Sequence, residues 1–250
     1  MRRACRRQDT ESNHTTPARL PPLGPRLRMV AALVRPGGTV ADIGTDHARL
    51  PVWLVLTGAC HAAVAADIRP GPLAAARRTV TEFAVTDRVR LILSDGLGAV
   101  PPTDDVVVAG MGGELIASIL AAGEWLRTPA VRLVLQPMTG EDELRRYLCR
   151  AGFAIRREAA AREGRHLYAA MAAEYDGRPW EPDALFCAAG TLTGRDGPAA
   201  RDYLRHRACV LEKQAAGLRL SADRRDEAGP LEELAAALRR RAKTDDSALC

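Results

Sequence analysis

The residues best suited to chemistry follow a short apolar run, 40–43, which is typical of a buried strand. Gly44 ends this run, and a helical pattern begins at Leu50. A glycine between a strand and a helix lets the backbone approach a ligand closely, and the first amides of the helix point toward that ligand. The polar residues of the turn are Thr45, Asp46 and His47. Taken alone, this turn is as consistent with a structural role as with a cofactor site.

Three more predicted strands end in polar or glycine residues. Asp67 and Ile68 end the second strand, and Asp67 follows Gly44 at close to the spacing of about 20 residues at which an acidic residue accepts hydrogen bonds from ribose hydroxyls. Asp95 and Gly96 follow the third strand, although Asp95 alone is better explained as a cap or turn residue. The fourth strand ends in Ala109-Gly110-Met111-Gly112-Gly113. Because ligands of open α/β sheets bind beyond the carboxyl ends of the strands, four such ends favour a ligand site.

Strands and helices alternate along the chain, which predicts the α/β class. The predicted helices cover residues 26–34, 50–56, 73–83, 114–122 and 141–150. The predicted strands cover 40–43, 62–68, 89–93, 106–109, 133–135, 153–157 and 166–171. This alternation requires a mostly parallel, Rossmann-like sheet with helices on both faces. Residues 159–165, between the last two strands, are too few for a crossover helix, so we expect the last strand to be antiparallel.

The chain divides into three predicted regions. Residues 1–22 are rich in arginine and proline without apolar periodicity, which predicts a disordered extension. Residues 23–178 form the predicted Rossmann-like domain, and 183–245 the predicted helical hairpin. The first hairpin helix has a coiled-coil seam formed by Leu204, Ala208, Leu211, Ala215 and Leu218. The second helix carries Leu231, Leu234 and Leu238, and a binding role would lie in outward arginines such as Arg205, Arg219, Arg224 and Arg239.

Composition limits the class of protein. The 250 residues carry a formal net charge of +5, which admits a polyanionic partner, although a solvated basic surface explains the charge equally well. No apolar run is long enough to span a membrane, and the first thirty residues lack the apolar stretch of a signal peptide, so we expect a cytoplasmic protein. The six cysteines include no CxxC pair, which indicates neither a metal site nor a disulfide framework.

The turn after the first strand favours S-adenosylmethionine over a dinucleotide. A dinucleotide site has three glycines around the pyrophosphate, whereas this turn has only Gly44, and the negative charge of Asp46 would repel phosphate. S-adenosylmethionine has no phosphate and carries a cationic sulfonium and an amino group, which Asp42 and Asp46 are candidates to hold. The candidate cofactor-binding residues are Asp42, Gly44, Thr45, Asp46, His47, Asp67, Ile68, Asp95, Gly96 and Ala109.

A family resemblance makes this interpretation specific. The segments ADIGTDHARLP, AADIRPGPLAAA, LSDGL, VVVAGMGGELIASIL and LVLQPM, followed by a helical hairpin, closely resemble the bacterial TrmK family of tRNA (adenine-22-N1)-methyltransferases. The resemblance covers roughly residues 23–243, and DIGTDH and AGMGG are its distinctive parts. It implies a class I methyltransferase domain that binds S-adenosylmethionine, and a coiled-coil domain that helps bind tRNA. The family usually has an aromatic residue where Arg49 stands.

Methylation at N1 of adenine needs no strong base, because N1 carries an available lone pair at pH 7. Catalysis then depends on alignment and on exclusion of water, and the base must leave its Watson–Crick pair to reach the pocket. Related methyltransferases hold the target base after the fourth strand. The candidate catalytic residues are Gly110, Met111, Gly112 and Gln136. Gln136 is equally consistent with a loop cap, and His47 suits a structural or substrate-orienting role better than that of a general base.

Two other functions remain open at this point. A methyltransferase of small molecules would share the four strand ends but would not need a basic hairpin. A regulatory protein that binds the cofactor without turnover would be compatible with Arg49 and with a hairpin that matches the family less closely. With tRNA as the expected partner, we expect no membrane association, no metal and a monomeric chain.

Overall fold

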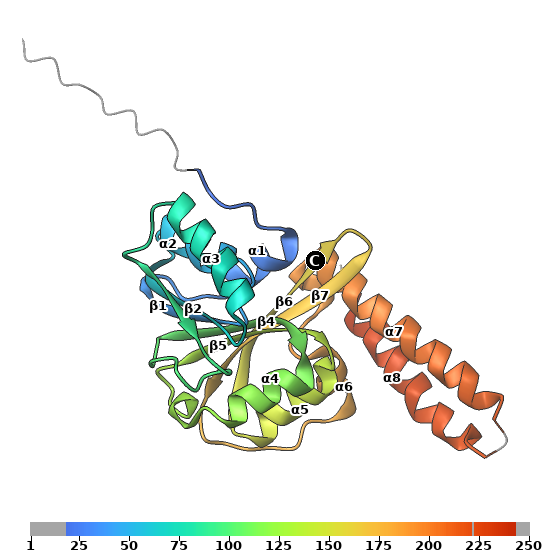
Figure 1. The fold of residues 1–250 in the computed structure, drawn as a ribbon. Helices are drawn as coiled ribbons and strands as arrows, with labels where there is room; N and C mark the ends of the chain where they lie inside the picture. The colour runs from blue at the N-terminus through green and yellow to red at the C-terminus, as the bar shows by residue number, and fades with distance from the viewer. Residues whose placement is uncertain (1–18, 222, 244–250) are drawn as a thin grey trace, which may run out of the picture.

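The computed structural model describes residues 19–221 and 223–243 (Figure 1). Its strands are β1 (Gly38–Ile43), β2 (Cys60–Asp67), β3 (Val89–Leu93), β4 (Asp105–Gly112), β5 (Arg132–Thr139), β6 (Phe153–Glu163) and β7 (His166–Tyr175). Its α-helices are α1 (Pro25–Ala31), α2 (Arg49–Leu56), α3 (Pro70–Glu82), α4 (Gly113–Ala121), α5 (Glu141–Arg150), α6 (Ala184–Ala189), α7 (Pro198–Arg219) and α8 (Ala228–Arg241). Short 3-10 turns are η1 (Glu124–Leu126), η2 (Gly194–Asp196) and η3 (Arg225–Glu227). Most of the predicted extension, 1–22, and the end of the predicted hairpin region lie outside the described residues.

The described strands form one sheet in the order β3-β2-β1-β4-β5-β7-β6. The pairs from β3 through to β5 are parallel, whereas β7 pairs antiparallel with both β5 and β6. This confirms the predicted Rossmann-like sheet with an antiparallel last strand. The turn at Gly164 and Arg165 joins β6 directly to β7, so β7 enters the sheet between β5 and β6.

Helices cover both faces of the sheet (Figure 1). One core lies between the sheet and α1, α2 and α3, and includes Val52 and Val80. The other lies between the sheet and α4 and α5, and includes Ile116 and Leu144. Side chains alternate between the two faces of a strand, so strands covered on both sides are almost continuously apolar. This explains why short runs of valine and alanine mark the central strands.

Several strands extend further than the sequence predicts, and β5 continues past the predicted 133–135 to Thr139. β4 continues through Gly112, so most of the segment predicted as a loop pairs irregularly with β5. Pro137 of β5 has no N–H to donate, which interrupts regular pairing at this position. β6 continues to Glu163 and β7 to Tyr175, so most of the predicted connection between them is itself strand. α6 was not predicted, because six residues are too few to give a periodic signal.

α7 and α8 form a hairpin that extends away from the sheet (Figure 1). The seam residues Leu204, Ala208, Leu211 and Ala215 are buried, as the predicted coiled-coil pattern requires, whereas Leu218 near the end of α7 is only half-buried. Tyr203 and Leu204 belong to a cluster that also contains Ala169 of β7, so the base of the hairpin packs on the sheet.

A buried ion pair joins the elements at the base of the hairpin. Arg145 of α5 is fully buried, and its Nε donates to Oε1 of Glu158 on β6 at 2.9 Å. Its Nη1 donates to the carbonyl oxygen of Cys187 in α6 at 2.7 Å. Breaking a buried pair on one side leaves an uncompensated charge, so this contact strongly restrains how α5, α6 and β6 pack.

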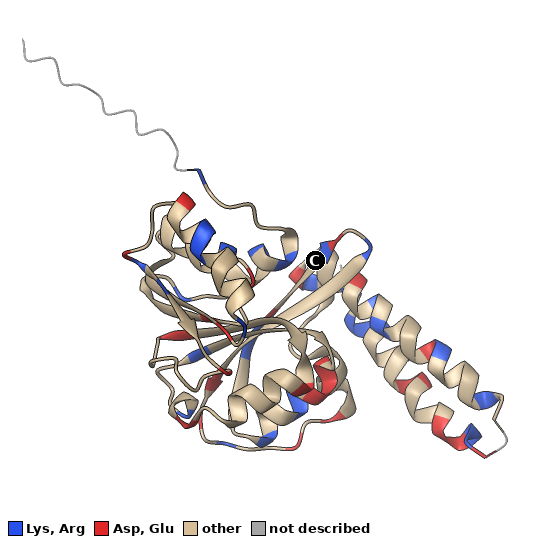
Figure 2. Ribbon diagram, viewed as in Figure 1, with Lys and Arg blue, Asp and Glu red and all other residues tan. Residues whose placement is uncertain are grey.

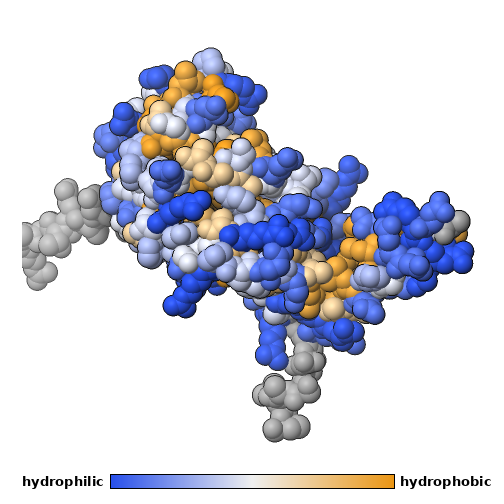
Figure 3. Space-filling model, turned by 90° about the horizontal axis from the view of Figure 1, so that it is seen from below, coloured by the Kyte–Doolittle hydropathy of each residue, from blue (hydrophilic) through white to orange (hydrophobic). Residues whose placement is uncertain are grey.

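The described residues also test the expectations drawn from composition. Cys60, Cys149, Cys187 and Cys209 are free thiols, and burial raises the pKa of Cys60 to about 11. Cys5 and Cys250 lie outside the described residues. None of the helices in the described part of the chain has the length and apolar character needed to cross a membrane. The face in Figure 3 is largely hydrophilic, with hydrophobic residues visible on the body and along the hairpin.

Candidate functional site

The polar strand ends meet along one edge of the sheet. The register places Ile43 of β1 beside Ala66 of β2 and Val108 of β4. Asp67 at the end of β2 pairs with Leu93 at the end of β3. The strand order reverses here, because β2 and β4 lie on opposite sides of β1. This is the position at which open α/β sheets bind their ligands.

Gly44 forms the turn between β1 and α2. Its φ of +78° lies in the left-handed region that favours glycine. The N–H groups of Gly44 and Thr45 both donate to the carbonyl oxygen of Ala66, at 2.8 and 2.9 Å, which fixes the turn to β2. A Cβ atom on Gly44 would overlap the Cε atom of Met111. The backbone conformation therefore requires glycine here, whereas the flexible end of Met111 could move aside.

Asp42 places a buried carboxylate beside this turn. Burial raises the pKa of Asp42 to about 6; the Thr45 hydroxyl opposes this rise and the negative charge of Asp67 adds to it. The Thr45 hydroxyl is itself buried and forms no hydrogen bond of standard geometry within the described part of the chain. Buried polar groups ordinarily have partners, so this carboxylate and hydroxyl indicate a polar ligand, and the negative charge favours a cationic one.

A pocket of about 230 Å³ opens between the Gly44 turn, α1 and the end of β4. It is lined by six of the predicted cofactor residues: Asp42, Gly44, Thr45, Asp46, His47 and Ala109. The other lining residues are Arg26, Leu27, Ala48, Arg49 and Leu50. Asp46 is exposed, His47 is half-buried, and His47 Nε2 lies 3.2 Å from Asp46 Oδ2. This pair therefore lies at the mouth of the pocket, whereas Asp42 and Thr45 lie deeper.

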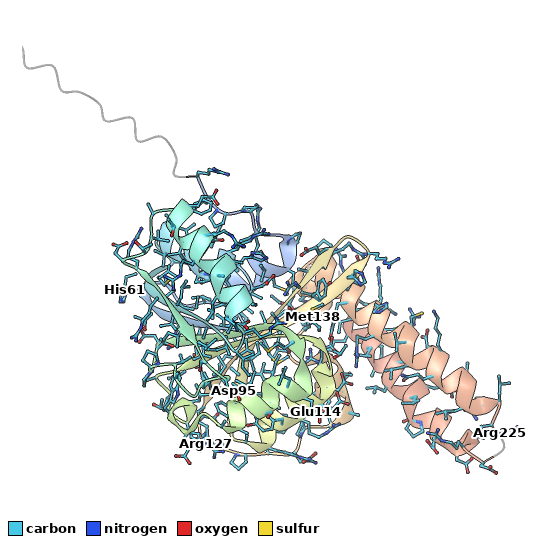
Figure 4. The ribbon with its side chains drawn as sticks, in the orientation of Figure 1. His61, Asp95, Glu114, Arg127, Met138 and Arg225 are labelled. Carbon is cyan, nitrogen blue, oxygen red and sulfur yellow. The ribbon has the colours of Figure 1, made fainter. Side chains whose placement is uncertain are left out.

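The remaining predicted cofactor residues follow β2 and β3. Asp67 is buried, and its Oδ1 accepts a hydrogen bond from the N–H of Arg69 at 2.8 Å. The Ile68 side chain next to it is 58% exposed, which is unusual for a large apolar group. Asp95 is exposed, and Gly96 turns the chain at a φ of +52°. Figure 4 labels Asp95 on the α4 side of the sheet and Met138 between the sheet and the hairpin.

The glycines at the end of β4 differ in the space around them. Gly110 has a φ of +81° and forms a bulge in the ladder with β5. A Cβ atom on Gly112 would meet only Oγ1 of Thr139, at 3.5 Å. A Cβ atom on Gly113 would overlap the carbonyl oxygen of Gly140. Gly113 is thus required by two backbones in close contact, whereas Gly112 leaves open space at the sheet edge.

Gln136 is engaged inside the protein at both ends of its amide. The side chain is fully buried, and its Oε1 accepts a hydrogen bond from Nη1 of Arg26 at 2.7 Å. Its Nε2 donates to the carbonyl oxygen of Pro137 at 2.6 Å. Arg26 is a site residue that sequence reasoning missed. It lies on α1, before the first strand, and no motif distinguishes it from the many other arginines of the chain.

The residues at this edge fit S-adenosylmethionine. The buried Asp42 carboxylate lies where a sulfonium or an amino group would be stabilised, and Asp67 retains an oxygen, Oδ2, that accepts no hydrogen bond from the described residues. The exposed Ile68 offers an apolar surface to a purine ring. No cluster of three or more histidine, cysteine or acidic side chains that could hold a metal occurs in residues 19–221 and 223–243.

Comparison with known proteins identifies the family of this site. Residues 23–171 match the family model of a methyltransferase domain. The tRNA (adenine(22)-N(1))-methyltransferase of Bacillus subtilis is 35% identical over 174 residues, which cover 69% of this chain and 73% of that protein. The crystal structure of the B. subtilis m1A22 tRNA methyltransferase TrmK superposes with a TM-score of 0.77 at 27% identity, over 88% of this chain and 99% of that one.

A second solved structure is a complex with the methyl donor. Streptococcus pneumoniae Sp1610, in complex with S-adenosyl-L-methionine, superposes with a TM-score of 0.73 at 28% identity, over 86% of this chain and 98% of that one. These similarities extend beyond the sheet into the helical hairpin. This chain belongs to the family of tRNA (adenine(22)-N(1))-methyltransferases.

Proposed function

We propose that this chain transfers the methyl group of S-adenosylmethionine to N1 of an adenine in tRNA, at position 22 as the name of its B. subtilis relative indicates. The relative position of two strand ends supports this proposal best. The buried acid Asp42 on β1 and the open surface at Gly112 on β4 lie on neighbouring strands at the same edge of the sheet. A cofactor site and an acceptor site thus lie next to each other.

The position of each cofactor residue along this edge of the sheet indicates which part of S-adenosylmethionine it contacts. Asp42 and Ala109 line the pocket that receives the methionine part, and Gly44 allows the backbone to approach it. Asp67 accepts hydrogen bonds from the ribose hydroxyls, and Ile68 packs against the adenine ring. The turn at Asp95 and Gly96 borders the adenine end. Asp46 and His47, paired at the mouth, orient the cofactor or the entering nucleotide.

When bound, S-adenosylmethionine supplies a sulfonium methyl carbon that the N1 lone pair attacks as the carbon–sulfur bond breaks, leaving S-adenosylhomocysteine and cationic N1-methyladenine. N1 has no proton to lose, so the protein need not supply a base. Its residues instead hold the flipped adenine in line and exclude water. Gly110, Met111 and Gly112 form the surface on which the base rests, because Gly112 leaves the necessary space.

In this proposal Gln136 does not contact the target adenine. Its two internal hydrogen bonds, to Arg26 and Pro137, would have to break before the amide could read an adenine. We therefore assign Gln136 to the support of the pocket wall.

We assign residues 23–178 to the methyltransferase domain, 183–245 to a hairpin domain that contacts tRNA, and 1–22 to an extension. Because tRNA is the substrate, the enzyme works in the cytoplasm. We also propose, as the sequence led us to expect, that the enzyme acts as a monomer.

Methyl transfer to defined tRNA transcripts tests the function. We expect labelled methyl groups to appear as N1-methyladenine in a transcript with adenine at position 22, and to be absent from the matched transcript with guanine there. Cofactor binding without transfer to any tRNA would favour a regulatory protein. Transfer to neither transcript, but to a small molecule in a cell extract, would favour a small-molecule methyltransferase. Equal labelling of both transcripts would refute the assignment of position 22.

A further inference from the structure

Arg26 is a cation whose position inside the pocket wall is fixed by the protein. Its backbone N–H donates to Oε2 of Glu163 at 2.9 Å, and its Nη1 donates to Oε1 of Gln136 at 2.7 Å. Its Cζ atom lies 5.8 Å from the centre of the Tyr168 ring. Because Gln136 is fully buried, the guanidinium is anchored at a defined place between α1, β5 and β7.

The anchored guanidinium faces the proposed methionine end of the pocket. A Cβ atom on Gly110 would lie 3.5 Å from Nη1 of Arg26, so the guanidinium lies against the backbone that follows Ala109. Arg26, Ala109 and Asp42 line the same pocket. Its Nε and Nη2 groups donate no hydrogen bonds to residues 19–221 or 223–243. The pocket therefore has a fixed positive pole and a buried negative pole.

We propose that Arg26 binds the carboxylate of the methionine part of S-adenosylmethionine, and that Asp42 faces its amino group. This rests on the proposed function, because it requires that cofactor in this pocket. An amino-acid group is a zwitterion and needs both poles, and a guanidinium presents parallel N–H donors that match a carboxylate. A tRNA phosphate is a less suitable anion here, because the buried carboxylate of Asp42 would repel it.

Gln136 is a positioning residue in this proposal. It touches neither carboxylate nor methyl group, but its Oε1 fixes Nη1 of Arg26 and so orients the remaining donors. Replacing Gln136 with alanine should therefore weaken binding of S-adenosylhomocysteine more than binding of an analogue that lacks the carboxylate, because Arg26 loses the acceptor that orients it.

The test compares two ligands that differ by one group: S-adenosylhomocysteine and its decarboxylated analogue. Calorimetry on the full chain should show that the native protein binds S-adenosylhomocysteine roughly 10- to 100-fold more tightly than the analogue. Arg26→Gln should bind both compounds with similar affinity, because the partner of the carboxylate is gone. Arg28→Gln is the matched control, since Arg28 is exposed on the same helix, donates to the carbonyl oxygen of Leu23 and does not line the pocket.

Each other outcome overturns the inference in a recognisable way. A full preference for S-adenosylhomocysteine in Arg26→Gln would show that another group binds the carboxylate, with Arg49 the next candidate on the pocket wall. Equal weakening of both ligands together with a lower melting temperature would show a structural role. Unchanged cofactor binding with weaker tRNA binding would assign Arg26 to a phosphate. If the native protein binds neither compound, the proposed function itself fails.

Discussion

Asp42 is a carboxylate at a position where folding makes its charge unfavourable. Its pKa of about 6 compares with 3.8 for an ordinary aspartate, so between these pH values the folded chain holds a proton that the unfolded chain releases. Its contribution to stability therefore falls as pH rises from about 4 to 6. By pH 7 the charged side chain lowers the free energy of unfolding by roughly 3 kcal/mol. A residue kept only for structure would not carry this cost.

Replacing Asp42 with asparagine should therefore stabilise the fold and impair the site. We expect the free energy of unfolding to rise at pH 7.5, and the difference from the native protein to shrink toward pH 4, where Asp42 of the folded native protein is also uncharged. Urea unfolding at the two pH values measures this, and calorimetry should show weaker binding of S-adenosylmethionine. Asp46→Asn, at an exposed carboxylate, is the control for stability. A less stable Asp42→Asn protein at pH 7.5 would show that its neighbours stabilise the charge.

Asp67 gives a second prediction at the residue scale. Its Oδ1 is occupied by the N–H of Arg69, which leaves Oδ2 to accept hydrogen bonds from the ribose. Asp67→Ala should weaken binding of S-adenosylmethionine by about 1 to 3 kcal/mol, the usual range for losing hydrogen bonds to a charged group. Calorimetry measures the change, and Asp95→Ala, at an exposed side chain, should lose less. Unchanged affinity in Asp67→Ala would remove this residue from the site.

At the scale of elements, Gly112 and Gly113 at the junction of β4 and α4 have different roles. Gly113 lies against the backbone of Gly140, whereas a side chain on Gly112 would enter open space near Thr139. Gly112→Val should therefore fold and bind the cofactor but lose methyl transfer, because the added side chain occupies the place of the base. Melting temperature, calorimetry and single-turnover methylation test this together.

Two further variants make the Gly112 result interpretable. Gly113→Ala should lower the melting temperature, since its Cβ would overlap a carbonyl oxygen. Gly44→Ala should weaken cofactor binding and transfer together, because its φ of +78° is strained for any other residue and the turn at the cofactor would shift. Normal methylation by a folded Gly112→Val protein would place the target base elsewhere.

The elements themselves could be predicted where local pattern determines them. Val89–Leu93 and Glu141–Arg150 coincide with their predicted ranges, because a short, mostly apolar run and a strongly amphipathic helix are both local signals. The extensions of β4 and β6 were missed, because pairing with a neighbouring strand, and not local composition, makes those residues extended. The ends of the strands could also be predicted from local sequence, because glycine and aspartate stand at or directly after the ends of apolar runs.

Contacts between distant segments could not be predicted. The bond between Arg26 and Gln136 joins α1 to β5, and nothing in either segment indicates the other. The same holds for Arg145, Glu158 and Cys187, which meet at the base of the hairpin. Such pairs depend on the packed arrangement of the whole chain, so a single sequence carries no local signal for them.

At the scale of the whole molecule, charge is unevenly distributed along the hairpin (Figure 2). The far part, residues 218–233, contains three basic and five acidic residues. The part near the sheet, residues 198–217 and 234–243, contains eight basic and two acidic residues. Three of the outward arginines expected to meet tRNA are already paired within the hairpin, each at both oxygens of a glutamate: Arg219 with Glu232, Arg224 with Glu227, and Arg239 with Glu212.

This distribution predicts that tRNA phosphates contact the base of the hairpin more than its tip. Arg201 and Arg205 lie one turn apart on α7, near the sheet, and form no ion pair within the described part of the chain. Replacing both with glutamine should weaken tRNA binding and reduce the slope of log affinity against log salt by up to about 2, since each lost phosphate contact removes about 0.7 to 0.9. Cofactor binding should not change.

The matched variant removes two charges from the tip, at Arg219 and Arg225; Figure 4 labels Arg225 at the far end of the hairpin. It should leave the salt slope close to that of the native protein, because the tip carries more acidic than basic residues and Arg219 is already paired with Glu232. Filter binding across a series of salt concentrations compares the two double variants directly. An equal loss of slope in both would mean that tRNA runs along the full hairpin and breaks its ion pairs on binding, which exposed pairs permit because each contributes only about 0 to 1 kcal/mol.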